Sequence, residues 1–274
     1  MISNPFDFTG RVAVVTGGSG VLGGAIAKAL GSCRATVWIV GRSRPEKAEA
    51  LAEEIRQSGG MAEAAQADVL DRASLLALSD RILARHGQVD FLVNAAGGTR
   101  KEATTRPECS FFDLPEEAVR HVFDLNMMGT FLPSQVFGRP MAAQGKGAIL
   151  NVSSYGAIHP LTRSSAYSAS KAAVTNFTQW LAVHLAQEYA PALRVNALVP
   201  GFFLTEQNRF LLTQPDSGKL TERGARIVAH TPAGRFGHPS DLVGPALWLL
   251  SDSATFVTGT TLVVDGGMTA FGGI

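Results

Sequence analysis

Short apolar runs rich in β-branched residues recur along the chain, and most are followed by a longer segment with helical patterning. The first run, Arg11–Thr16 (RVAVVT), shows no alternation of apolar and polar positions from Val12 to Val15, which is typical of a strand buried on both faces. The same reasoning predicts further strands at Ala35–Val40, Met61–Ala67, Phe91–Asn94, Ala148–Ser153, Arg194–Leu198 and Thr261–Val264.

Helices are predicted between these strands. Pro45 suits the first position of one helix, and Gly59–Gly60 suits its end. The alternation predicts an α/β Rossmann fold with a doubly wound parallel sheet, in which ligands bind at the carboxyl ends of the strands. Because no linker rich in Pro, Gly and Ser divides residues 1–274, we expect a single domain. The predicted helices are Val21–Leu30, Pro45–Ser58, 71–86, 115–138, 165–189 and 240–251.

Residues 202–230 interrupt this alternation between the strand ending at Leu198 and the helix beginning near residue 240. The segment mixes polar with apolar residues, as in NRFLLTQPDSGKLTERGARIV. Long irregular segments inside compact domains are commonly functional, so we predict a short substrate lid over 202–230. A peripheral helical insertion is an equal alternative.

Composition adds few constraints on function. Hydrophobic residues make up 46% of the 274 residues and the formal net charge is +1, so charge gives no reason to expect nucleic acid or an anionic membrane as partner. Only two cysteines, Cys33 and Cys109, are present, and no apolar stretch reaches the roughly 20 residues that span a bilayer. The beginning of the chain, MISNPFDFTGRVAVV, lacks the pattern of a signal peptide. We therefore expect a cytoplasmic protein with reduced thiols and a small-molecule substrate.

The first strand runs into a glycine-rich turn and then directly into a helix. Glycines let the backbone approach a pyrophosphate closely, and a helix N-terminus offers free N–H groups. Gly18, Gly20 and Gly23 satisfy the general G-x-G-x-x-G spacing, and their placement between a strand and a helix is the context which that motif requires. The predicted cofactor contacts here are Gly17, Gly18, Ser19, Gly20, Val21 and Leu22.

The end of the second strand bears on the choice between NAD and NADP. Proteins that bind NAD usually place an acidic residue there, whereas an Arg accommodates a 2′-phosphate. Here the strand ends in Gly41, Arg42 and Ser43 without an acid, which favours NADP(H) and leaves NAD(H) possible. The alternative is that Arg42 is an ordinary solvated loop charge. Further cofactor contacts are predicted at two later strand ends, namely Asp68 and Val69, then Asn94, Ala95, Ala96 and Gly97.

A candidate chemical site follows the fifth strand. Tyr167 and Lys171 are separated by four positions and share one face of a helix, so the ammonium can lie near the phenol. We expect this cation, with oxidised nicotinamide, to lower the pKa of the phenol from about 10. Tyr167 could then exchange a proton with a substrate oxygen that Ser154 holds by a hydrogen bond. A surface aromatic–cation pair is the usual alternative for such spacing.

The order of these elements resembles the classical short-chain dehydrogenase/reductase family over essentially the whole chain. The turn Thr16–Gly23 matches the family's cofactor turn except that Val21 replaces its middle glycine, and Asn94–Gly97 matches Asn-Asn-Ala-Gly with alanine second. The resemblance implies a homotetramer and oxidoreductase activity with catalytic Asn126, Ser154, Tyr167 and Lys171, in which Asn126 holds a water of a proton relay. It also implies cofactor contacts from Tyr167, Lys171, Pro200, Gly201 and Thr205.

Four segments, at 123–138, 160–182, 200–212 and 230–252, resemble the D-mannonate oxidoreductase (fructuronate reductase) branch of that family. This implies interconversion of a keto-uronate and a sugar acid. A sugar acid needs a cation for its carboxylate and hydrogen-bonding groups for its hydroxyls. The candidates are Arg163, Gln207, Asn208 and Arg209, with Arg100, Lys101 and His159 behind them.

Two other functions remain open from the sequence. One is a reductase or dehydrogenase of another small carbonyl, such as a 3-oxoacyl thioester, a polyol or an aldose. The other is a dinucleotide-binding redox sensor without turnover, for which a lost Tyr or Lys would be expected, whereas both are present. No metal is predicted, because His121, His159, His184, His230 and His238 do not form a metal-ligand spacing.

Overall fold

The computed structural model describes residues 5–205, 208–214 and 216–273. Its core is a seven-stranded parallel sheet with the order β3-β2-β1-β4-β5-β6-β7, so the direction of winding reverses between β1 and β4. The predicted doubly wound Rossmann fold is thus confirmed. The strands are β1 (Val12–Thr16), β2 (Thr36–Gly41), β3 (Met61–Gln66), β4 (Phe91–Asn94), β5 (Gly147–Val152), β6 (Leu193–Pro200) and β7 (Thr261–Val264).

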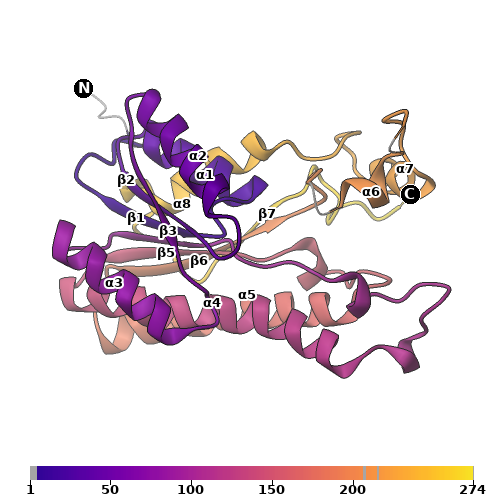
Figure 1. Ribbon diagram of the computed structural model, residues 1–274, viewed down its shortest axis with the longest axis horizontal. Coiled ribbons are helices and arrows are strands. Elements are labelled where there is room, and N and C mark those ends of the chain that lie inside the picture. The colour runs from indigo at the N-terminus through magenta and orange to yellow at the C-terminus, as the bar shows by residue number, and fades with distance from the viewer. Residues whose placement is uncertain (1–4, 206–207, 215, 274) are drawn as a thin grey trace.

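Helices cover both faces of the sheet (Figure 1). α1, α2 and α8 lie on one face and α3, α4 and α5 on the other, and each face is sealed by its own cluster of buried apolar side chains. Among the described residues, no helix combines the length and the apolar character needed to cross a membrane. The helices are α1 (Val21–Ser32), α2 (Pro45–Gln57), α3 (Arg72–His86), α4 (Glu116–Gln144), α5 (Ser165–Glu188), α6 (Arg209–Leu212), α7 (Glu222–Ala229) and α8 (Val243–Leu250).

Two predicted helices differ from those observed. The helix expected over 115–138 continues to Gln144 with Pro133 and Pro140 inside it, and it ends where Gly145 adopts a left-handed φ of +70°. A proline removes only one backbone donor, and packing against α5 and the sheet holds the helix together. The helix expected over 240–251 is split into a 3₁₀ turn, Pro239–Leu242, followed by α8.

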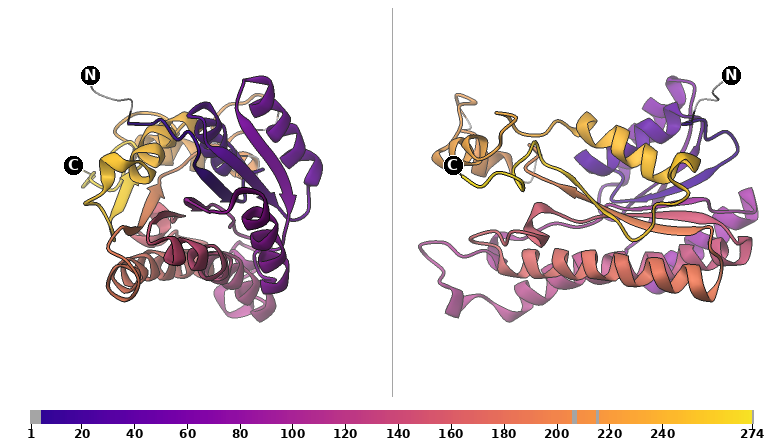
Figure 2. Two further views of the ribbon diagram at one scale, coloured as in Figure 1. Left: turned by 90° about the vertical axis from the view of Figure 1, so that its left-hand side faces the viewer. Right: turned by 180° about the vertical axis from the view of Figure 1, so that it is seen from behind.

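The segment 202–230 contains two short helices, α6 and α7. They stand beyond one end of the sheet, close to the C-terminus of the chain (Figures 1 and 2). The hydroxyl of Thr221 accepts a hydrogen bond from the Gly224 N–H at 3.0 Å, which caps α7, and donates to the Leu211 carbonyl at 2.7 Å, which ties α7 to α6. The described part of the segment therefore contains a small helical unit, in which α7 is tied to α6.

Candidate active site

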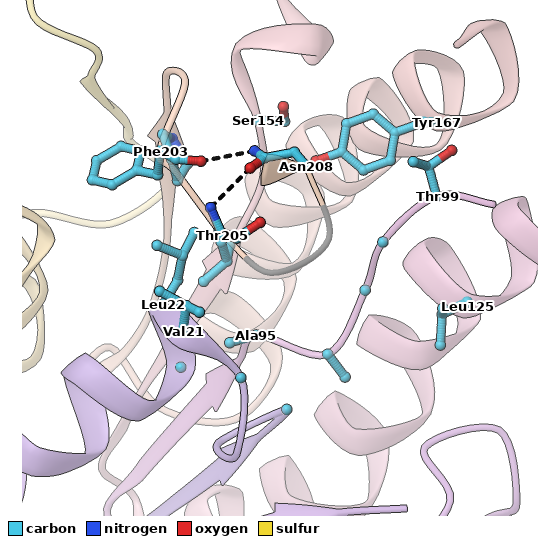
Figure 3. Close-up of a pocket in the computed structure, with 18 of the residues that line it drawn as sticks. Val21, Leu22, Ala95, Thr99, Leu125, Ser154, Tyr167, Phe203, Thr205 and Asn208 are labelled. Carbon is cyan, nitrogen blue, oxygen red and sulfur yellow. Dashed lines mark hydrogen bonds between the residues drawn. The ribbon is translucent and has the colours of Figure 1, made fainter. Parts of the chain in front are cut away.

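A cleft of 440 Å³ opens at the carboxyl ends of the strands, where the winding of the sheet reverses between β1 and β4. Loops that follow β1, β2, β3, β4, β5 and β6 line it, together with the 202–230 segment. Figure 3 shows Val21 and Leu22 at one side, Tyr167 and Ser154 at the other, and Thr205 and Asn208 between them. This is the place at which doubly wound sheets bind ligands.

The glycine-rich turn between β1 and α1 forms one wall of the cleft. Gly17 has a φ of +63°, and a Cβ there would lie 2.6 Å from the backbone nitrogen of Ala96. Val21 stands where the family has a glycine. It is the first residue of α1 and adopts the helical backbone conformation. Gly18 does not line the cleft, because it packs under the turn against Val15. The predicted contacts that do line it are Gly17, Ser19, Gly20, Val21 and Leu22.

The ends of β2 and β3 form the far end of the cleft. Gly41, Arg42, Asp68 and Val69 line it as predicted, whereas Ser43 does not. The Arg42 guanidinium forms an ion pair of 3.3 Å with the Asp68 carboxylate. Arg42 is therefore no isolated loop charge, although its side chain is 52% exposed.

At the end of β4, Ala95, Ala96 and Gly97 line the cleft, but Asn94 does not. The Asn94 amide is buried and donates to Ser134 Oγ at 3.0 Å and to Asn151 Oδ1 at 2.9 Å. It thus joins β4 to α4 and β5. Its predicted contact with the cofactor does not follow from the structure, because the side chain points into the core.

Tyr167, Ser154 and Lys171 meet at the cleft wall. Ser154 follows β5, accepts a hydrogen bond from the Gly156 N–H at 3.1 Å and is hydrogen-bonded to the Tyr167 phenol. The Lys171 ammonium lies 5.9 Å from the centre of the Tyr167 ring and donates to the Val152 carbonyl oxygen at 2.7 Å. The predicted proximity of the three side chains is confirmed.

The expected lowering of the phenol's pKa involves oxidised nicotinamide as well as Lys171, and the chain by itself does not produce it. Burial raises the pKa of Tyr167, and the hydrogen bond from Ser154 opposes this only in part. Burial also lowers the pKa of Lys171 to about 8. The Lys171 ammonium is held by a carbonyl oxygen and lies over the Tyr167 ring.

Asn126 lies in α4 behind the cleft and is fully buried. Its Oδ1 accepts from the Gly98 N–H at 3.1 Å, and its Nδ2 donates to the Gly98 carbonyl at 2.8 Å and to the Val122 carbonyl at 2.7 Å. These bonds fix the loop after β4 next to Lys171. The proton-relay role of Asn126 stays a prediction.

The predicted substrate residues are not gathered in the cleft. Arg163 and Arg209 are exposed and do not line it, Arg100, Lys101 and His159 are exposed, and Gln207 lies outside the described residues. Asn208 does line the cleft, but its amide braces its own loop, with Nδ2 donating to the Phe203 carbonyl and Oδ1 accepting from the Thr205 N–H, each at 2.8 Å (Figure 3). Pro200, Gly201 and Thr205 line the cleft as predicted.

Several lining residues were missed by the sequence reasoning. Tyr155 stands 6.0 Å from Phe202 between ring centres, and both line the cleft near Ser154. Arg223, at the start of α7, also lines it. Its only signal in the sequence was its place inside the segment predicted as a lid. Among the described residues, no group of three or more His, Cys, Asp or Glu side chains is placed to hold a metal ion.

The sequence matches a family model described as enoyl-(acyl carrier protein) reductase over residues 19–269. The Bacillus subtilis protein known as uncharacterized oxidoreductase UxuB is 47% identical, over 98% of both chains. The chain belongs to the short-chain dehydrogenase/reductase family. It is therefore an oxidoreductase of a family whose members act on alcohol groups, and the alternative of a sensor without turnover is set aside.

Two solved structures share the fold over nearly the whole chain. A Haemophilus influenzae protein provisionally named D-mannonate oxidoreductase, solved with NAD, has a TM-score of 0.91 and 38% identity, covering 98% of both chains. A Beutenbergia cavernae protein provisionally named NAD(P)-dependent gluconate 5-dehydrogenase, solved with NADP at low occupancy, has a TM-score of 0.85 and 36% identity, covering 98% of this chain and 100% of the other. Relatives of this chain thus bind either dinucleotide.

Proposed function

We propose that this oxidoreductase interconverts a sugar acid and its keto form, with D-mannonate and D-fructuronate as the pair. The observation that carries the chemistry is the meeting of Tyr167, Ser154 and Lys171 at the wall of the cleft. The substrate is supported by the likeness to the Haemophilus influenzae protein that carries the name D-mannonate oxidoreductase provisionally.

The residues of the cleft fit a nicotinamide dinucleotide. Gly17 leaves a space beside Ala96 that a Cβ would fill, and the turn leads into the N-terminus of α1, whose free N–H groups suit the phosphates of a dinucleotide. When bound, the dinucleotide supplies the site that accepts or releases a hydride. We propose the cofactor contacts predicted above, except those of Gly18, Ser43 and Asn94, which do not line the cleft.

Tyr167 moves a proton at the substrate oxygen in this scheme. During oxidation of the alcohol its phenolate accepts the hydroxyl proton, and during reduction the phenol returns it. Ser154 holds the same oxygen by a hydrogen bond. Because burial alone raises the pKa of Tyr167, the positive charge of oxidised nicotinamide and of Lys171 has to stabilise the phenolate when the cleft is filled.

NADP(H) is the favoured cofactor in this proposal, with NAD(H) as the alternative. Arg42 and Arg44 both line the end of the cleft that follows β2. A 2′-phosphate at this end would offer Arg42 a second partner beside Asp68, and a guanidinium binds a phosphate well.

The segment 202–230 acts as the substrate lid in this proposal. Leu211 and Leu212 of α6 and Arg223 of α7 line the cleft, so the segment forms part of its wall.

We also propose that the protein is a cytoplasmic homotetramer. Trp180 and Val183 lie along α5 and are each more than half exposed, which supports a helical face that a second copy covers. Cys33 and Cys109 are both free, as expected in a reducing compartment.

A panel of sugar acids, polyols, aldoses and 3-oxoacyl thioesters, assayed at 340 nm with each dinucleotide, tests the proposed substrate. We expect the highest kcat/KM with D-mannonate or D-fructuronate. Turnover of uncharged alcohols alone, or of thioesters alone, would remove the sugar acid and leave one of the other carbonyl substrates.

A further inference from the structure

Arg223 lies at the start of α7, and contacts on both sides of it hold this turn in place. Thr221 caps the helix and ties it to Leu211, and Gly224 packs so closely on the Leu212 carbonyl that no side chain would fit there. The Arg223 guanidinium is therefore carried to the cleft by a braced turn, and its side chain lines the cleft beside Leu211 and Leu212.

Among the described residues, no carboxylate pairs with this guanidinium. Arg223 is half-buried, its Nε is buried without a hydrogen-bond partner, and no ion pair joins it to a described carboxylate. Arg226, one turn further along the same helix, instead pairs with Glu222 at the surface. A buried donor of a charged group is destabilising when it has no partner, so Arg223 is placed to bind an anion from outside the chain.

A second positive charge lies close to this group. Burial lowers the pKa of Arg223, and the charge of Arg163 lowers it further, so the two side chains lie near each other although Arg163 does not line the cleft. Arg163 belongs to the loop before α5, the helix that carries Tyr167. The two cations therefore lie on the side of the cleft where the proposed chemistry takes place.

The described residues that line the cleft supply a single carboxylate. Among its described lining residues the one acid is Asp68, which sits at the end of β3 and pairs with Arg42. The cations Arg223 and Lys171, at the end of the cleft away from Asp68, are therefore available to an anionic ligand.

We propose that Arg223 is the residue that binds the carboxylate of the substrate, with Arg163 adding positive charge beside it. This inference rests on the proposed function in one respect, that the substrate is an acid whose hydroxyl reacts at Tyr167. A guanidinium holds a carboxylate through paired hydrogen bonds, which fixes the distance between the charged end of the substrate and the reacting carbon. Arg223 thus gives the enzyme a preference for acids over neutral polyols.

Kinetics of Arg223→Ala, Arg223→Lys and Arg226→Ala, with D-mannonate and its neutral amide, test this proposal. For Arg223→Ala we expect the KM for D-mannonate to rise about 30-fold or more, with the KM for the dinucleotide within about threefold of wild type. The KM for D-mannonamide should change by less than about threefold, and Arg223→Lys should recover part of the loss. Arg226→Ala, the matched control on the same helix, should leave every constant within about twofold of wild type.

Three results would overturn the role of Arg223. These are an unchanged KM for D-mannonate in Arg223→Ala, an equal rise for the acid and the amide, or a rise in the KM for the dinucleotide instead. If wild type does not oxidise the amide, the test of Arg223 uses only the KM for D-mannonate and the KM for the dinucleotide.

The proposed substrate can fail separately. If wild type oxidises a different sugar acid but not D-mannonate, that acid and its amide replace D-mannonate and D-mannonamide. The role of Arg223 is then tested with these two compounds. If wild type oxidises uncharged alcohols alone, both the sugar-acid function and the role of Arg223 are contradicted.

Discussion

The Lys171 ammonium donates a hydrogen bond to the backbone carbonyl oxygen of Val152 at 2.7 Å. This bond anchors a buried cation at the end of β5, 5.9 Å from the Tyr167 ring. A charge held in this way is costly for the fold, because burial lowers the pKa of Lys171 to about 8. A buried cation that lowers the stability of the fold is what one expects of a functional group.

Lys171→Met should remove activity without weakening the fold. We expect kcat/KM to fall about 100-fold or more, because the proton exchange at Tyr167 loses its cation. The free energy of unfolding at pH 7 should stay within about 2 kcal/mol of wild type, since the lost bond to Val152 is offset by the relief of burying a charge. Denaturant unfolding and steady-state rates of the same samples measure both.

The stability of wild type should also depend on pH in a way that this variant lacks. The folded-state pKa of Lys171, about 8, lies below its usual value of 10.5, so the unfolded chain binds more protons between these values. The contribution of Lys171 to the free energy of unfolding should rise through this range, by at most about 3.5 kcal/mol, and the cost of burying the charge is fully present below pH 8. Lys146→Met, at an exposed lysine, is the control and should keep the rise.

Gly97→Ala should lower activity by displacing Asn126 and Lys171. A Cβ at Gly97 would lie 2.6 Å from Asn126 Oδ1 and 3.2 Å from Lys171 Nζ. Moving these groups displaces the loop after β4 and the ammonium, so we expect kcat/KM to fall about 100-fold. Gly244→Ala, where an exposed helical glycine has no heavy atom within 4 Å of the added Cβ, should keep full activity. Equal activity of the two variants would show that Gly97 does not position the site.

Arg42→Ala tests the choice of dinucleotide. We expect the KM for NADP to rise about tenfold or more and the KM for NAD to change by less than about threefold, because only the former offers a phosphate to the guanidinium. Arg85→Ala removes an arginine that pairs with Glu63 away from the cleft, and should affect neither. A parallel loss with both dinucleotides, or a wild-type preference for NAD, would contradict the NADP proposal.

Much of the fold follows from the sequence pattern alone. β4 and β7 have the predicted bounds, because each is a short apolar run closed by polar residues or glycine. α4 was predicted too short, since its continuation past Pro133 and Pro140 depends on packing against α5 and the sheet. Local patterning does not contain such tertiary support.

The site was predictable where residues follow strands, because the carboxyl ends of parallel strands converge. Side-chain direction was not predictable. Asn94 follows the same rule as Gly97, yet its amide turns into the core toward Ser134 and Asn151. Arg223 was missed because the path of residues 202–230 is set by contacts between α6 and α7, which no periodicity reveals.

The central claim is that the Tyr167 phenol exchanges the proton during hydride transfer, and Tyr167→Phe tests it most directly. Single-turnover oxidation of the best substrate of the panel should be slowed about 1,000-fold or more, while binding of NADPH, followed by fluorescence, stays within about threefold of wild type. Tyr189→Phe, at an exposed tyrosine after α5, should react like wild type. A Tyr167→Phe rate within tenfold of wild type, with the dinucleotide bound normally, would contradict the account.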